Sequence, residues 1–156
     1  MKGTVKWNKN MYKLFTFLFL SFGYAPIAWH YNLGEAKTIA QKEHRHILLN
    51  FSGSDWCGPC IRMHREIFGT DVFEHMADSS LVMVNADFPR MKKNQLPTAQ
   101  QQLNDAMADK YNSKGKFPYT VLLTADGRVL KAWDGFPGEA PEAFAREVQT
   151  IIDNDK

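Results

Sequence analysis

Short apolar runs alternate with stretches of helical apolar spacing over most of the chain, and together they predict an α/β domain. The runs at Ile47–Phe51 and Leu81–Ala86 are expected to be buried strands. Two further strands, joined by a turn at Asp126-Gly127, are expected at Phe117–Leu123 and Val129–Trp133. A first helix is expected at Leu33–His44, capped by Asn32. A second is expected at Ile61–His75, and Gly69-Thr70-Asp71 breaks it to leave a short helix at Val72–Met76. Two more helices are expected, from Thr98 or Ala99 to Tyr111 and at Glu142–Ile152.

The chain's two cysteines lie in the sequence Trp56-Cys57-Gly58-Pro59-Cys60, between a predicted strand and a predicted helix. A helix N-terminus presents free N–H groups and partial positive charge. Both stabilise a thiolate, which is the species that attacks disulfides. The C-x-x-C pair in this position therefore predicts redox chemistry.

Two other interpretations of the pair are a structural disulfide and a structural zinc site. A structural disulfide that closes so short a loop restricts the unfolded chain little. A structural zinc site usually has four ligands, and His64 would be a third with no obvious fourth. Metal binding and an idle cysteine pair remain as alternatives to redox chemistry.

The first residues have the order of a secretory signal peptide. Four lysines precede or border the apolar block Leu14–Phe22, and no acidic residue occurs before Glu35. Small residues follow, so residues 1–23 are predicted to be removed, with cleavage as late as residue 28 also considered. The competing interpretation is an uncleaved anchor, although the block is short for a span of about 20 residues.

Removal of this leader would change the charge and the expected compartment. The formal net charge is +2 for the whole chain and falls to near −2 without the four leader lysines. The basicity therefore gives no case for nucleic-acid binding. Export also leads to a compartment that permits disulfides.

The cysteine motif and the order of the elements resemble those of the thioredoxin superfamily over about Ile47 to Ile152. Phe117-Pro118 matches the cis proline that the family places opposite its active site, and Gly135 matches a glycine near the substrate groove. The resemblance implies an α/β thioredoxin fold: a central mixed sheet flanked by helices, with an added N-terminal helix, over residues 29–156.

The chain departs from the family at a buried acid–base pair. Asn50 stands where thioredoxins have an aspartate that is thought to help deprotonate the second cysteine, and Met83 stands at the position assigned to the partner lysine. An asparagine cannot accept and hold a proton in that way. The polar insertion after Phe88 and the stretch before Cys57 resemble exported bacterial members more than the cytosolic protein.

The resemblance implies roles for the residues of the motif. Cys57 would be the nucleophile and Cys60 the resolving thiol, supported by Gly58 and Pro59. Trp56 would cover the site, or simply be a half-buried tryptophan. The substrate groove would include Phe117 and Pro118, whose backbone groups would pair with an extended client.

Charged residues near the motif have two interpretations each. His64 is expected to be a solvated helix residue, with electrostatic tuning of the site as the alternative. Arg90, Lys92 and Lys93 are expected to form a solvated loop, with docking of an acidic partner as the alternative.

The predicted function is a monomeric thiol–disulfide oxidoreductase of the bacterial periplasm that reduces or isomerises client disulfides. Gly58-Pro59 is the dipeptide of reducing thioredoxins, whose potential is about −270 mV, whereas strong oxidants lie near −120 mV. The expected partners are disulfide-containing proteins and a membrane thiol reductant, and no cofactor or metal is expected. A weak oxidase and a non-catalytic client-binding module remain as alternatives.

Overall fold

The computed structural model describes residues 27–155, and the predicted leader at residues 1–23 lies outside them. A five-stranded mixed sheet forms the centre of the domain, in the order β1-β3-β2-β4-β5. The three strands β1, β3 and β2 are parallel, whereas β4 runs antiparallel to β2 and β5 antiparallel to β4. The strands are β1 (Trp29–His30), β2 (His46–Ser52), β3 (Leu81–Asp87), β4 (Tyr119–Leu123) and β5 (Val129–Asp134).

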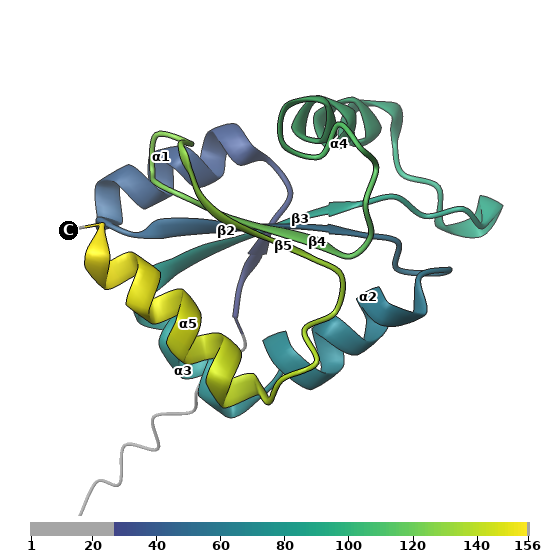
Figure 1. The fold of residues 1–156 in the computed structure, drawn as a ribbon. Coiled ribbons are helices and arrows are strands. Elements are labelled where there is room, and N and C mark those ends of the chain that lie inside the picture. Colours follow the sequence, from purple (N-terminus) through teal and green to yellow (C-terminus); the bar gives the residue numbers. More distant parts are fainter. Residues whose placement is uncertain (1–26, 156) are drawn as a thin grey trace, which may run out of the picture.

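Helices cover both faces of this sheet (Figure 1). The elements are α1 (Leu33–Glu43), α2 (Gly58–Met63) continued by a π-helical turn η1 (His64–Phe68), α3 (Asp71–Ser80), a 3-10 turn η2 (Lys92–Asn94), α4 (Thr98–Tyr111) and α5 (Pro141–Asn154). Helices α1 and α4 lie on one face, and α2, α3 and α5 lie on the other. Among residues 27–155, no helix is long and apolar enough to cross a membrane.

Alternation along the strands sends side chains to two separate cores. Leu48 and Met83 pack with Phe73 and Phe144 on the face covered by α3 and α5. On the opposite face, their neighbours along the strands pack against α1 and α4; these include Ile47, Leu49, Phe51, Val82 and Val84. Full burial of one such side chain stabilises the fold by about 1.5–3 kcal/mol.

The predicted fold class is confirmed, and most predicted elements are present. Asn32 caps α1 by accepting a hydrogen bond from the Gly34 N–H at 2.8 Å. The predicted helix at Val72–Met76 is longer than expected and continues to Ser80, where β3 follows without a loop. Strand β1 was not predicted, because two residues are too short to show a periodic pattern.

The hairpin between β4 and β5 differs in detail from the predicted two-residue turn. The Thr124 N–H donates to the Arg128 carbonyl at 2.9 Å, so three residues form the loop. Gly127 has a φ of 95°, which favours glycine. Strand β4 begins at Tyr119 rather than Phe117, since Pro118 has no N–H to donate to the sheet.

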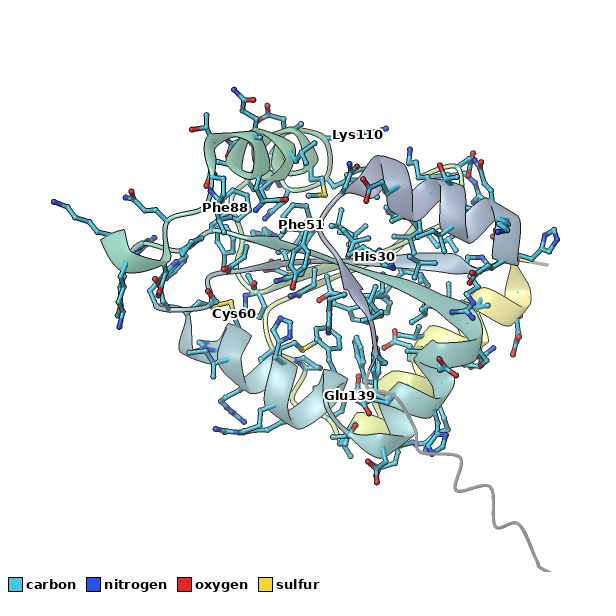
Figure 2. All side chains as sticks on the ribbon, turned by 180° about the vertical axis from the view of Figure 1, so that it is seen from behind. His30, Phe51, Cys60, Phe88, Lys110 and Glu139 are labelled. Carbon is cyan, nitrogen blue, oxygen red and sulfur yellow. A yellow bond between two sulfur atoms is a disulfide. The ribbon has the colours of Figure 1, made fainter. Side chains whose placement is uncertain are left out.

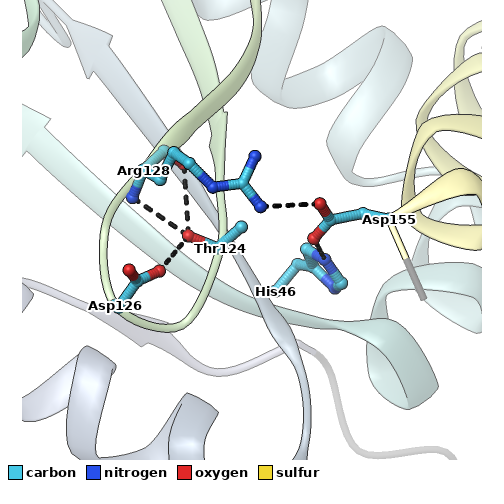
Figure 3. A network of polar contacts seen from close by, with 5 residues as sticks. All are labelled: His46, Thr124, Asp126, Arg128 and Asp155. Carbon is cyan, nitrogen blue, oxygen red and sulfur yellow. Dashed lines mark hydrogen bonds and ion pairs between the residues drawn. The ribbon is translucent and has the colours of Figure 1, made fainter.

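A polar network joins this hairpin to the C-terminal helix at the end of the sheet where β2 begins (Figure 3). The Asp155 carboxylate after α5 accepts from Arg128 at 2.7 Å and lies 3.0 Å from His46 Nε2. Thr124 donates to the Asp126 carboxylate within the hairpin. Because His46 starts β2 and Ser52 ends it, this network lies at the opposite end of the strand from the cysteine motif.

Candidate active site

Cys57 and Cys60 form a disulfide where the loop after β2 enters α2. Their Cα atoms are 5.2 Å apart. Cys57 retains 5% of its surface exposed, whereas Cys60 retains none, so Cys57 is the more exposed of the two residues. Figure 2 shows the disulfide, labelled at Cys60, at the same end of the sheet as Phe88.

The local sequence explains how Cys57 is placed at the start of α2. Cys57 has an extended backbone and is the N-cap, and its carbonyl accepts the first helical hydrogen bonds from Cys60 and Ile61. The Cys60 N–H also points at Cys57 Sγ, at 3.3 Å. Pro59 lies in the first turn, where its missing N–H costs nothing. A thiolate on Cys57 would therefore be stabilised by the helix N-terminus.

Trp56 is held in place beside the disulfide by three contacts. Its Nε1 donates to the Phe88 carbonyl at 2.7 Å, and its ring meets that of Phe117 edge-on at 5.4 Å. The Arg90 guanidinium lies 3.5 Å from the ring centroid. Gly53 leaves room for the ring, because a Cβ there would lie 2.3 Å from Trp56 Cε2. Trp56 thus connects the cysteine motif to the loop after β3.

Asp55 anchors the same loop from the other side. Its carboxylate accepts from the backbone N–H groups of Arg90 and Met91, each at 2.9 Å, and from Asn94 Nδ2 at 3.0 Å. The Arg90 hydrogen bond in particular lowers the pKa of the Asp55 carboxyl below its ordinary value. Arg90, Lys92 and Lys93 are all exposed, as expected for the predicted solvated loop, and the Arg90 guanidinium also stacks on the Trp56 ring.

Phe117 and Pro118 lie directly before β4, and the bond between them is cis, as predicted. Pro118 is buried, and its carbonyl accepts from the Gly135 N–H at 2.9 Å. Phe117 packs against Trp56, which precedes Cys57. The structure therefore places this segment beside the cysteine motif.

Asn50 is fully buried in β2 and has three side-chain partners. Its Oδ1 accepts from the Thr120 hydroxyl at 3.1 Å, and its Nδ2 donates to Asn85 Oδ1 at 3.2 Å. The third partner is His64 Nε2, at 3.3 Å. The residue paired with Asn50 on β3 is Asn85, whereas Met83 pairs with Leu48. The assignment of Met83 to the partner position was therefore wrong, and the position is polar but uncharged.

His64 is half-buried rather than solvated, which corrects the main expectation for it. Its ring lies 5.0 Å from that of Trp29 and 5.5 Å from that of Phe68. Burial lowers the pKa of the His64 imidazole, and the nearby Asp87 carboxylate partly opposes this. A neutral ring is favoured as a result.

A row of polar residues beside the motif was not predicted. Ser52 donates to Asn85 Oδ1 at 3.1 Å and to Asp87 Oδ1 at 3.2 Å. Asp87 also accepts from the Ser54 N–H at 2.8 Å. The sequence contained a signal for this row. Alternate residues of a strand lie on one face, and on one face of β2 and of β3 the side chains are apolar in the middle of the strand and polar toward the end near the motif.

An open cavity of about 470 Å³ lies between these polar residues and α2. Among residues 27–155, no group of three or more His, Cys, Asp or Glu side chains is arranged to bind a metal ion. The residues that line the cavity include Ser52, Ser54, Cys60, His64, Arg65 and Asn85.

Comparison with known proteins agrees with this site. The sequence model of the thioredoxin-like domain matches residues 33–151. The chain therefore belongs to the thioredoxin-like family, and its fold and cysteine pair are those of a thiol–disulfide oxidoreductase.

The chain is similar to two proteins of Chlamydia pneumoniae. The "Disulfide bond reductase DsbH" is 35% identical over 128 residues, which cover 82% of this chain and 74% of that protein. The "Thioredoxin-related protein DsbJ" is 26% identical over 83% of this chain, but only 36% of that protein is covered. A solved structure described as "DsbH Oxidoreductase" has a TM-score of 0.74 and 33% identity, covering 83% of this chain and 86% of that one.

Proposed function

We propose that this protein reduces or isomerises disulfides of client proteins in an extracytoplasmic compartment, through the Cys57/Cys60 dithiol. The observation that carries the proposal is the position of Cys57 at the N-cap of α2, with the Cys60 N–H directed at its sulfur. Gly58-Pro59 between the cysteines and the similarity to a protein described as a disulfide bond reductase both support the reducing direction.

The reaction has two exchange steps. The Cys57 thiolate attacks one sulfur of a client disulfide, forms a mixed disulfide and releases the other client sulfur as a thiolate. Cys60 then loses its proton and attacks Cys57 Sγ, which restores the Cys57–Cys60 disulfide and releases the second client thiolate. Two electrons pass from the protein to the client, and the two client thiolates take up protons.

Client binding is assigned to the surface around the exposed edge of Cys57. Phe117 precedes β4 without being part of its ladder, so its backbone groups are suited to pair with an extended client segment. The Gly135 hydrogen bond to the Pro118 carbonyl holds this segment in place. The ring of Trp56 adds an apolar contact next to the disulfide.

The protein must be reduced again after each turnover. A membrane thiol reductant is the proposed electron donor, because the predicted leader at residues 1–23 would place the domain outside the cytoplasm. The periplasm of a bacterium is the proposed compartment, and the domain would act there as a monomer.

The equilibrium redox potential tests the direction of electron flow. Equilibration of the purified domain with glutathione buffers is expected to give a value between about −270 mV, typical of thioredoxin, and about −180 mV, typical of protein disulfide isomerase. A value near −120 mV, typical of a strong oxidant, would favour an oxidase.

Trapping of clients tests the roles of the two cysteines. Cys60→Ser is expected to accumulate mixed disulfides with clients in the native host, because no resolving thiol remains. Cys57→Ser should not accumulate them, and the double variant is the control for background capture. Equal capture by both single variants would contradict the assignment, and full biological activity of Cys57→Ser would favour a non-catalytic binding module.

A further inference from the structure

Cys60 and His64 lie one helical turn apart on the same side of the helix that follows the motif. The backbone N–H of His64 donates to the Cys60 carbonyl, so the two residues have the helical i, i+4 relation. Side chains in this relation are neighbours, and a helical side chain points back toward the preceding turn. Both residues line the same cavity. The helix changes to a π-helical turn at His64, a feature that often marks functional sites.

The cavity is suited to proton exchange between these two side chains. It is lined by Ser52, Ser54 and Asn85 as well as by Cys60 and His64, and its volume of about 470 Å³ is ample for water. Cys60 itself has no exposed surface in the disulfide form. Its thiol therefore needs a nearby group to accept its proton, because a buried environment disfavours a thiolate.

Asn50 fits both protonation states of the His64 ring. An amide presents both donors and an acceptor, so it can donate to a neutral ring or, turned over, accept from a protonated one. Its other partners, the Thr120 hydroxyl and the Asn85 amide, can likewise both donate and accept. The two contacts of Asn50 with Thr120 and Asn85 can therefore exchange donor and acceptor roles when the amide turns over.

We propose that His64 takes up the proton that the Cys60 thiol loses in the resolving step, directly or through one water, and that Asn50 accommodates both states of the ring. The inference rests on the proposed function, in which Cys60 attacks the mixed disulfide. The S–H bond of Cys60 breaks, its electron pair forms the bond to Cys57 Sγ, and the Cys57–client bond breaks. The client leaves as a thiolate, and the proton on the imidazole passes to the client thiolate or to solvent.

The charges around His64 are compatible with this role. Asp87 on β3 is the anionic group that acts on the ring and favours its protonated form. Arg65, next along the helix, lines the cavity and is paired with Glu66. The groups that face His64 from β1 and β2 are the Trp29 ring and the Asn50 amide, which are uncharged.

Reaction of the reduced protein with a nitrobenzoate disulfide, whose thiolate product is coloured, separates the two steps. Attack by Cys57 releases the first coloured thiolate, and attack by Cys60 releases the second. In His64→Gln the first release should keep its rate, whereas the second should slow by about 10²-fold near neutral pH, the lower end of general-base effects. His30→Gln, on β1, is the matched control and should keep both rates.

The pH profile separates proton transfer from a structural role. In the wild-type protein the second release should become independent of pH above the pKa of His64, measured on the same reduced protein by NMR. In His64→Gln it should rise about tenfold per pH unit, because the proton must then pass to solvent. Equal slowing of both releases, an unchanged second release, or a wild-type profile that does not follow the His64 titration would overturn the proposal. A wild-type protein that gives no second release would instead contradict the Cys57/Cys60 dithiol mechanism itself.

Discussion

Asn50 carries no charge and has three polar partners, two of which, His64 and Asn85, line the cavity that Cys60 also lines. A buried carboxylate at this position would repel a thiolate on Cys57. The neutral amide should therefore make the Cys57 thiolate easier to form than it is in thioredoxins, which have an aspartate there. A more stable thiolate stabilises the reduced protein and makes the disulfide more oxidising.

Asn50→Asp is expected to make the Cys57 thiolate harder to form and to shift the potential to more negative values. The shift should be about 30 mV for each tenfold change in the equilibrium constant. Titration of thiolate absorbance and equilibration with glutathione measure the two quantities. Asn154→Asp, which adds the same charge at the exposed end of α5, is the control. If Asn50→Asp leaves both quantities unchanged, Asn50 does not act on Cys57.

At the scale of elements, the loop after β3 and the cysteine motif are held together by Trp56 and Asp55. Trp56 packs over Gly53, so Gly53→Ala should force the ring to move. Overpacking of this kind costs about 1–3 kcal/mol in the free energy of unfolding. Denaturant unfolding and tryptophan fluorescence should both change. Gly138→Ala, where the added Cβ would meet nothing within 4 Å, is the control. Unchanged stability and fluorescence in Gly53→Ala would show that the Trp56 packing is not constrained.

The contact of Asp155 with Arg128 and His46 joins the end of α5 to the sheet (Figure 3). The Arg128 hydrogen bond, followed by that of His46, lowers the pKa of the Asp155 carboxyl below its ordinary 3.8. A lowered pKa means that the carboxylate stabilises the fold above the unfolded-state pKa, and that this contribution is lost as the pH falls through the folded-state pKa.

Asp155→Asn should accordingly be less stable than the wild-type protein at neutral pH. The difference should shrink as the pH is lowered below about 4, near the ordinary pKa of an aspartate. Denaturant unfolding over a pH series measures it. Asp109→Asn removes a charge from the exposed surface of α4 and controls for the change in net charge. A difference that stays constant down to strongly acidic pH would mean that the Asp155 charge does not stabilise the fold.

At the scale of the whole molecule, the proposed location depends on the leader. Mass spectrometry of protein from the native host is expected to find an N-terminus between about Tyr24 and Trp29, the window that follows a short apolar region. An intact N-terminus at Met1, or at Met11 if translation starts there, on a membrane-bound form would instead indicate an anchor.

Much of the architecture could be predicted because local pattern and tertiary structure agree. Ile47–Phe51 and Leu81–Ala86 are apolar runs whose residues are almost all buried, and Glu142–Ile152 has a helical stripe that faces the core. The cysteine motif was also evident, because its chemistry resides in consecutive residues at the start of a helix.

The sequence alone therefore determined most of the elements and, through their order, the fold class. It also identified the cysteine pair, since these features depend on patterns within single segments. Only the tertiary structure decided what surrounds the sulfurs. The register of β2 against β3 paired Asn50 with Asn85 instead of Met83, and the packing of the helix on β2 brought His64 to Asn50. Contacts between segments far apart in the chain depend on strand register and helix packing, and no local pattern specifies them.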